Sequence, residues 1–220
     1  MWHQKGTNMI FENIVGNERN KELLKSIIDA NNIAHSYMFV GKESIGKLIF
    51  AKEFAKAILC ESSEKPCNIC KSCIEFDTYN NPDFSMLEPE GTSIKIDPIR
   101  EFIKKVYEKP VVSNRKVYII NDSNYMTKEA QNALLKTLEE PPEYVTIILI
   151  TSNENMFLPT IKSRCTKITF NKLKDTELAR VLEKQYNYLN VPEIVFKVSQ
   201  RKCKKSNKFK RQRRRIFKNK

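Results

Sequence analysis

The sequence predicts an α/β fold in which a parallel β-sheet is covered by helices on both faces. Short apolar runs, each long enough for one strand, alternate with longer segments whose apolar residues have helical spacing. The short runs are apolar at nearly every position, which is typical of strands buried on both faces. Such strands belong to parallel sheets with helices packed against both sides.

The order of the predicted elements follows from these patterns and from the residues that end them. Strands are expected within residues 34–41, 83–91, 115–122, 145–153 and 158–170, the last preceded by one helical turn. Helices are expected within residues 19–32, 47–60, 96–110, 126–142 and 174–190. Thr127 offers an N-cap for the helix within 126–142, and Pro141 ends it.

Four segments are expected along the chain. Residues 1–8 form a leader or extension, and residues 9–172 form the α/β domain. Residues 173–200 begin a new helical pattern, which indicates part of a small helical lid domain. Residues 201–220 form a basic tail that is expected to be disordered, because blocks of like charge repel one another.

The net charge of +13 comes almost entirely from that tail. Residues 201–220 hold 12 of the 39 Lys and Arg residues and no acid, so residues 1–200 carry 27 basic and 26 acidic residues. The tail has two interpretations: a shifted reading frame of an A-rich gene, or an arm that binds phosphates non-specifically. The nearly neutral body argues against a protein whose main function is nucleic-acid binding.

A cytoplasmic location is expected by default. No apolar run approaches the roughly 20 residues that span a bilayer, and the start has no apolar signal-peptide core. We therefore expect no membrane partner. Four of the six cysteines lie within fourteen residues, which in an intracellular chain indicates a metal site in place of disulfides.

Residues 41–48, GKESIGKL, have the spacing of a phosphate-binding P-loop. Gly41, Gly46 and Lys47 occupy the motif positions between a predicted strand and a predicted helix, where backbone N–H groups can surround phosphates. The motif normally ends in Ser or Thr, whose hydroxyl binds Mg²⁺, but this chain has Leu48. A glycine-rich turn without a ligand is the alternative.

The second half of a nucleotide site is altered as well. P-loop enzymes hold the metal with an Asp at the end of a buried strand, but the strand VYIIND has Asn121 at that position and Asp122 after it. Metal binding is thus weakened at two positions, Leu48 and Asn121, which predicts a site that does not hydrolyse nucleotide. ATP or ADP could still bind through Lys47 and the backbone.

The cysteine cluster predicts a structural zinc site. Cys60, Cys67, Cys70 and Cys73 can supply four thiolates to a tetrahedral Zn²⁺, and four sulfur ligands leave no open position for catalysis. An iron–sulfur cluster and free thiols are the alternatives. The cluster is expected in a polar loop.

Taken in order, these motifs resemble the delta-prime subunits of the bacterial DNA polymerase III clamp loader, which are AAA+ proteins. The resemblance covers about residues 9–200 and rests on AHSYMFVG, the P-loop, the four cysteines, IDPIREF, KVYIIND, NALLKTLEEPP and IKSRC. The ATPase motor subunits of the same complex, of gamma/tau type, are a weaker match. Leu48 and Asn121 favour the delta-prime type.

The resemblance implies a non-hydrolysing stator that helps to load a sliding clamp on primed DNA. Its partners would be the gamma/tau ATPase subunits and the delta subunit, with clamp and DNA reached through the complex. Arg164, in the motif Ser163-Arg164-Cys165, would act as an arginine finger in a neighbouring motor's ATP site. A surface arginine paired with an acid is the alternative for this residue, and an active gamma/tau-type ATPase is the rival for the whole chain.

The resemblance also implies a small zinc module at residues 60–73, after the P-loop helix. Residues 151–153 end another strand at the place where AAA+ proteins have a γ-phosphate sensor, and a strand-end cap is the alternative for them. It further implies a longer protein with three domains, so this chain is expected to be truncated within the second one. Without the third, helical collar domain, the 220-residue chain is expected to assemble poorly.

Overall fold

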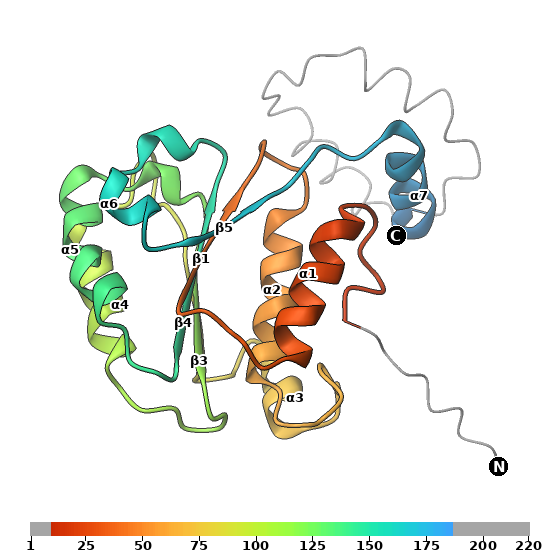
Figure 1. Cartoon of the computed structure of the whole chain (residues 1–220), viewed down its shortest axis with the longest axis horizontal. Helices are drawn as coiled ribbons and strands as arrows, with labels where there is room; N and C mark the ends of the chain where they lie inside the picture. Colours follow the sequence, from red (N-terminus) through yellow and green to blue (C-terminus); the bar gives the residue numbers. More distant parts are fainter. Residues whose placement is uncertain (1–9, 187–220) are drawn as a thin grey trace, which may run out of the picture. The chain divides into compact units, whose positions relative to one another are not determined.

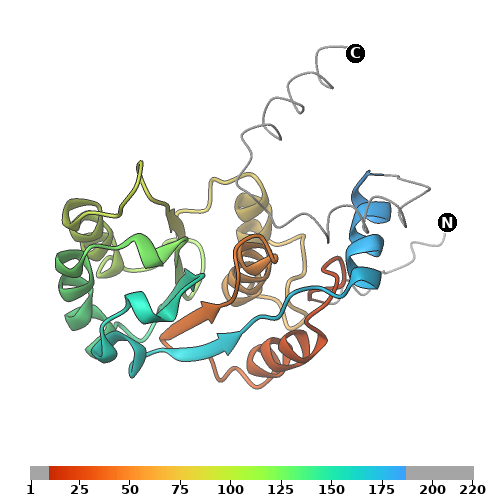
Figure 2. The same cartoon turned by 90° about the horizontal axis from the view of Figure 1, so that it is seen from above.

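A computed structural model describes residues 10–186 of the chain. Its centre is a five-stranded sheet with the order β2-β3-β4-β1-β5. All neighbouring strands in it are parallel. The strands are β1 Ser36–Val40, β2 Phe84–Leu87, β3 Lys116–Ile120, β4 Val145–Thr151 and β5 Thr166–Thr169. Figure 2, seen from above, shows β1 and β5 side by side, although most of the domain separates them in the sequence.

Helices cover both faces of the sheet (Figure 1). The helices α1, α2 and α3 lie on one face, and α4, α5 and α6 lie on the other. Their bounds are α1 Glu18–Asp29, α2 Lys47–Leu59, α3 Lys71–Asp77, α4 Ile96–Val106, α5 Lys128–Glu139 and α6 Pro159–Lys162. Each face has its own cluster of buried apolar side chains. The predicted α/β fold class, with a parallel sheet between two helical layers, is confirmed.

The predicted ends of α5 are confirmed at the level of single residues. The side chain of Thr127 accepts a hydrogen bond from the backbone N–H of Ala130, as an N-cap does. The helix ends at Glu139, two residues before Pro141. Local sequence signals therefore set the length of this helix.

The cysteine segment differs from the expected polar loop because it includes a helix. Cys70 is the N-cap of α3, and Cys73 lies within the helix. Buried Cys73 and Phe76 anchor this short helix, and the ring of Phe76 lies 4.5 Å from that of Phe84 on β2. Seven residues give too short an apolar pattern to identify a helix from the sequence.

The internal contacts of the chain divide it between Lys172 and Leu173. After this division the structure describes one helix, α7 Asp175–Tyr186, where the backbone N–H of Lys174 donates to the carboxylate of Glu177. The predicted leader at 1–8, the rest of the lid segment after 186 and the basic tail lie outside the described residues. Among residues 10–186, no helix has the length and apolar character needed to cross a membrane.

Asp83 is a buried anchor of the α/β domain. The residue is 1% exposed. Its carboxylate accepts hydrogen bonds from the backbone N–H groups of Val111, Val112 and Ser113, at 2.7–2.8 Å. Hydrogen bonds to charged groups contribute more than neutral ones, and a donor left unpaired in the interior is costly. The single carboxylate thus fixes the loop before β3.

We expect Asp83→Ala to lower the free energy of unfolding by about 3 kcal/mol, because three backbone donors lose their acceptor. Chemical denaturation followed by circular dichroism measures this change. Asp97→Ala is the matched control, since the Asp97 side chain is 80% exposed. Equal stabilities of the two variants would show that the three hydrogen bonds do not anchor the loop.

Candidate functional site

The loop between β1 and α2 has the backbone of a phosphate-binding loop. Gly41 follows β1, and its N–H donates to the carbonyl of Thr151 at the end of β4. A Cβ at Gly41 would lie 2.6 Å from the backbone oxygen of Phe170, so no side chain fits there. Gly46 has φ +93°, a left-handed conformation that favours glycine, and forms the N-cap of α2. Both glycines are therefore required by the shape of the loop.

Lys47 is folded back over this loop. Its ammonium group donates to the carbonyls of Gly41 and Lys42, both at 2.6 Å, and the residue is 6% exposed. Burial lowers the pKa of Lys47, whereas the carboxylates of Asp122 and Glu43 act in the opposite direction. The structure thus brings the three predicted phosphate-binding residues, Gly41, Gly46 and Lys47, together at the N-terminus of α2.

The two positions that normally bind Mg²⁺ have no hydroxyl and no carboxylate. Leu48 is partly buried and packs against the apolar cluster that includes α1 and α2. Asn121 follows β3, and its amide donates to the carboxylate of Glu88 at 3.0 Å. An Asp at this position would lie against the carboxylate of Glu88, and the two like charges would repel each other. The local geometry therefore matches an amide at residue 121.

Asn124, which the sequence motifs did not include, holds the end of β4 by hydrogen bonds. The side-chain oxygen of Asn124 accepts hydrogen bonds from the hydroxyl of Thr151 and from the backbone N–H of Ser152, at 3.3 and 3.2 Å. Thr151 is fully buried. Its hydroxyl also accepts from the N–H of Asn153. These contacts are those of a strand-end cap, one of the two alternatives for this segment.

The four cysteines of the cluster converge in space. The sulfur atoms of Cys60, Cys67, Cys70 and Cys73 all lie within 4.8 Å of one another, and those of Cys60 and Cys70 are 4.0 Å apart. Tetrahedral zinc with Zn–S bonds of about 2.3 Å places its sulfurs about 3.8 Å apart. The donor set and its spacing therefore fit a metal ion that prefers sulfur ligands.

Backbone groups support the sulfurs of the cluster. The N–H of Cys67 donates to the sulfur of Cys60, and the N–H of Cys70 donates to the sulfur of Cys67, at 3.4 and 3.3 Å. Burial raises the pKa of Cys73 and of Cys60. Burial also acts to raise the pKa of Cys67, but hydrogen bonds outweigh this effect and lower the pKa to about 6. These hydrogen bonds come from the backbone of Ile69 and Cys70 and from the side chains of Cys60 and Cys70. Such N–H···S bonds stabilise thiolates, which are the form that binds metal.

Arg164 lies in the turn between α6 and β5. One terminal nitrogen, Nη2, lies 2.7 Å from the carboxylate of Glu139, and the other, Nη1, donates to the carbonyl of Thr160 at 2.8 Å. The Arg164 side chain is 33% exposed. The surface pairing with an acid, considered as the alternative for this arginine, is therefore present in this structure.

Arg164 and the P-loop lie at opposite ends of strand β1. The hydroxyl of Ser36, at the start of β1, donates to the carbonyl of Arg164. Gly41 follows the other end of the same strand. Because β1 has 5 residues and each adds about 3.3 Å, at least ~13 Å of sheet lies between the two sites. Arg164 is thus not a component of this chain's own P-loop site.

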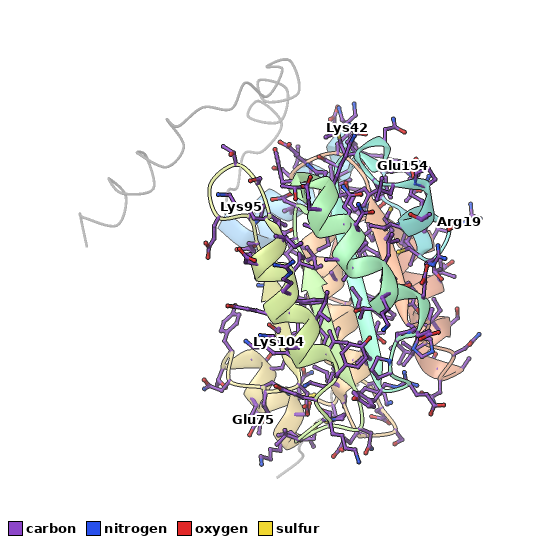
Figure 3. The ribbon with its side chains drawn as sticks, turned by 90° about the vertical axis from the view of Figure 1, so that its left-hand side faces the viewer. Arg19, Lys42, Glu75, Lys95, Lys104 and Glu154 are labelled. Atoms are coloured by element: carbon purple, nitrogen blue, oxygen red, sulfur yellow. The ribbon has the colours of Figure 1, made fainter. Side chains whose placement is uncertain are left out.

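The cysteine cluster is a third, separate location. It follows the C-terminal end of α2, whereas the P-loop precedes the N-terminal end of that helix. Figure 3 shows Lys42 of the P-loop and Glu75 of α3 at opposite ends of the molecule. The structure therefore gathers the P-loop residues and the cysteines each into one place, and it keeps the P-loop apart from both Arg164 and the cysteine cluster.

Comparison with known proteins gives a consistent family. A family model described as "DNA polymerase III, delta subunit" matches residues 16–174. The DNA polymerase III subunit delta' of Bacillus subtilis is 36% identical over 154 residues, which are 70% of this chain and 47% of that protein. The tau/gamma subunit of Haemophilus influenzae is 33% identical over 184 residues, which are 83% of this chain and 27% of that protein. The chain thus spans about half the length of the first relative and less of the second.

Solved structures support the same fold. A DNA polymerase III gamma subunit-related protein of Thermotoga maritima has a TM-score of 0.51 at 27% identity, over 73% of this chain and 49% of that one. The RuvB Holliday junction branch migration motor of the same organism has a TM-score of 0.53 at 12% identity, over 79% and 51%. At that identity RuvB shows the fold alone, and the AAA+ fold expected from the sequence is confirmed. The match to the family model over residues 16–174 shows that the chain belongs to the DNA polymerase III, delta subunit, family.

Proposed function

We propose that this protein is a non-hydrolysing, delta-prime-type stator in a DNA polymerase III clamp loader, and that it supplies Arg164 to the ATP site of a neighbouring motor subunit. The proposal rests on the contrast between the two ends of the parallel strands. At the end with the P-loop, Leu48 and Asn121 replace the hydroxyl and the carboxylate that normally bind Mg²⁺. At the opposite end, Arg164 is partly exposed.

Loss of hydrolysis follows from the positions of Leu48 and Asn121. Leu48 has no oxygen to offer, and the neutral amide of Asn121 is a weaker ligand than a carboxylate for the Mg²⁺ that neutralises charge during phosphoryl transfer. Leu48 instead contributes to the apolar core, and the Asn121 amide contributes a hydrogen bond to Glu88. Both replacements serve the stability of the domain, as expected where selection for hydrolysis has relaxed.

Binding of a nucleotide is a separate property of the same loop. Gly41, Gly46 and Lys47 retain the geometry of a phosphate site, and none of them depends on a metal. For ATP or ADP to bind, the Lys47 ammonium would exchange the carbonyls of Gly41 and Lys42 for phosphate oxygens. We propose that the chain can bind such a nucleotide without turning it over.

A role of Arg164 in trans is favoured by its distance from its own P-loop. An arginine finger stabilises the negative charge that develops on the phosphoryl group, and its planar, permanently charged fork suits this task. Arg164 follows α6 directly, with its backbone held by Ser36 and its guanidinium partly exposed. A neighbouring subunit that packs against this edge of the sheet would bring its nucleotide to Arg164.

We further propose that the four cysteines bind one structural Zn²⁺. The tetrahedral spacing of the sulfurs and the two N–H···S bonds favour zinc over free thiols. The segment 60–73 would then be a module that zinc holds against α2. The ion would have a structural role, because four sulfur ligands leave no position for a substrate.

The proposed partners are gamma/tau-type ATPase subunits and a delta subunit, with the sliding clamp and primed DNA reached through the complex. In the same proposal α7 begins the lid domain that follows the α/β domain. A motor function is the second candidate, because tau/gamma subunits also match, as the Haemophilus influenzae relative does at 33% identity.

The proposal is tested by adding this chain to a gamma/tau-type subunit and measuring the motor's ATP hydrolysis with Mg²⁺. The added chain carries Lys47→Ala, so that all turnover belongs to the motor. We expect the motor's turnover to rise and then saturate as more chain is added. An unchanged rate in a mixture in which the chain co-elutes with the motor in gel filtration would contradict the stator function.

A further inference from the structure

We propose that Glu139 is a latch on Arg164 that competes with the γ-phosphate of the neighbouring nucleotide for this arginine. The inference rests on the proposed function, since it assumes that Arg164 meets a motor's ATP site. It adds a residue that determines specificity: Glu139 would set how strongly this subunit distinguishes an ATP-bound neighbour from an ADP-bound one.

The geometry of the pair holds the Arg164 side chain back against its own domain. Nη2 is 2.7 Å from a carboxylate oxygen of Glu139, the last residue of α5. Nη1 donates to the carbonyl of Thr160, four residues earlier in the chain, so the guanidinium lies against α6. One of its five N–H donors is thereby in a hydrogen bond, and Nη2 is held in the ion pair. We call this arrangement the latched position of Arg164.

The backbone of Arg164 is fixed independently of its side chain. Its N–H donates to the carbonyl of Ile161, and its own carbonyl accepts from the hydroxyl of Ser36. Ile161 and Ser36 are buried. Leaving the latched position therefore requires only rotations of the Arg164 side chain, without any change in α6 or β5.

A γ-phosphate is the type of group that can compete with Glu139 for the guanidinium. Both are anionic oxygen acceptors that suit the arginine fork, but the terminal phosphate of ATP carries more negative charge than one carboxylate. An exposed ion pair of this kind is weak, and the Glu139 side chain is 45% exposed. A neighbour with ATP can therefore draw Arg164 away, whereas ADP lacks the competing group and leaves the latch closed.

The position of Glu139 is not explained by helix stability. A carboxylate at the C-terminus of a helix faces the negative end of the helix dipole, which is unfavourable. The packing of α5 and α6 already rests on the buried apolar side chains of Leu138 and Ile161. The favourable contact of Glu139 in this structure is its ion pair with Arg164.

Glu139→Gln and Glu140→Gln form a matched pair of variants, because the two acids are adjacent and Glu140 is also exposed. The affinity of each variant for a gamma/tau-type subunit is measured twice, with AMP-PNP and with ADP in the motor. For Glu139→Gln we expect binding to the AMP-PNP form to tighten about two- to fivefold, because no exposed ion pair has to be broken first. Binding to the ADP form should not change, and Glu140→Gln should match the wild-type chain in both.

Repeating the measurement with Arg164→Ala shows whether Glu139 acts through the arginine. We expect Glu139→Gln to have no effect on that background, whereas a purely structural role of Glu139 would persist. Equal affinities of the Glu139 and Glu140 variants, or weaker AMP-PNP binding by Glu139→Gln, would overturn the latch. If the wild-type chain binds the motor but Arg164→Ala stimulates its ATP hydrolysis equally well, the proposed function fails, and the latch fails with it.

Discussion

Replacing Arg164 by alanine is expected to slow ATP hydrolysis at the motor site that it faces by a factor on the order of 10³–10⁵, the range that arginine fingers supply. The effect is large because the guanidinium acts on charge that develops in the transition state. Folding should be nearly unaffected, since the lost ion pair with Glu139 is partly exposed and contributes little. The measurement is single-turnover hydrolysis by the mixed complex.

Arg100→Ala is the control for this prediction. Arg100 is also a surface arginine, and it is paired with Asp97 on α4, away from the turn that carries Arg164. We expect this variant to stimulate the motor as the wild-type chain does. Equal losses in the two variants would assign the effect to general surface charge and remove Arg164 from the role of finger.

Removal of the proposed zinc ion from the cysteine cluster is expected to have the second large effect. Structural zinc contributes about 10–16 kcal/mol of apparent binding free energy in small zinc-binding peptides at neutral pH, and that energy stabilises the folded form. With a strong chelator we expect α3 and the loop before it to lose hydrogen-exchange protection. The sheet should stay protected, because its two apolar clusters do not include the loop.

Metal analysis of two cysteine variants checks the assignment. Cys67→Ser removes a partly exposed ligand, so the substitution itself disturbs packing little. We expect one zinc and no iron per wild-type chain, and loss of the zinc in Cys67→Ser. Cys165→Ser is the control, because burial raises the pKa of Cys165 to about 11 and the residue lies outside the cluster. Iron in place of zinc would establish the iron–sulfur alternative.

The sheet and its main helices could be predicted from the sequence because their signals are local. Each strand is a continuous apolar run, and α5 is bounded by Thr127 and Pro141, which act on their own backbone. The phosphate loop was identified in the same way, from Gly41, Gly46 and Lys47 at fixed spacing. Local rules of conformation and hydrogen bonding are enough for such elements.

The features that the sequence did not reveal depend on contacts between distant residues. Asn124 caps the end of β4 only because β3 and β4 are neighbours in the sheet. The amide of Asn121 donates a hydrogen bond to Glu88 because β2 lies beside β3. Glu139 meets Arg164, 25 positions later, through the packing of α5 against α6. None of these pairs has a spacing that a sequence motif could encode.

The central claim is that this chain does not hydrolyse ATP, and its most direct test is turnover by the purified chain with Mg²⁺ beside a Lys47→Ala variant. Lys47 is the residue proposed to bind phosphate with its ammonium group, so the variant sets the background of the assay. We predict that the wild-type rate equals that background. Turnover that depends on Lys47 would contradict the claim, because Leu48 and Asn121 would then be compatible with catalysis and the chain would be a motor.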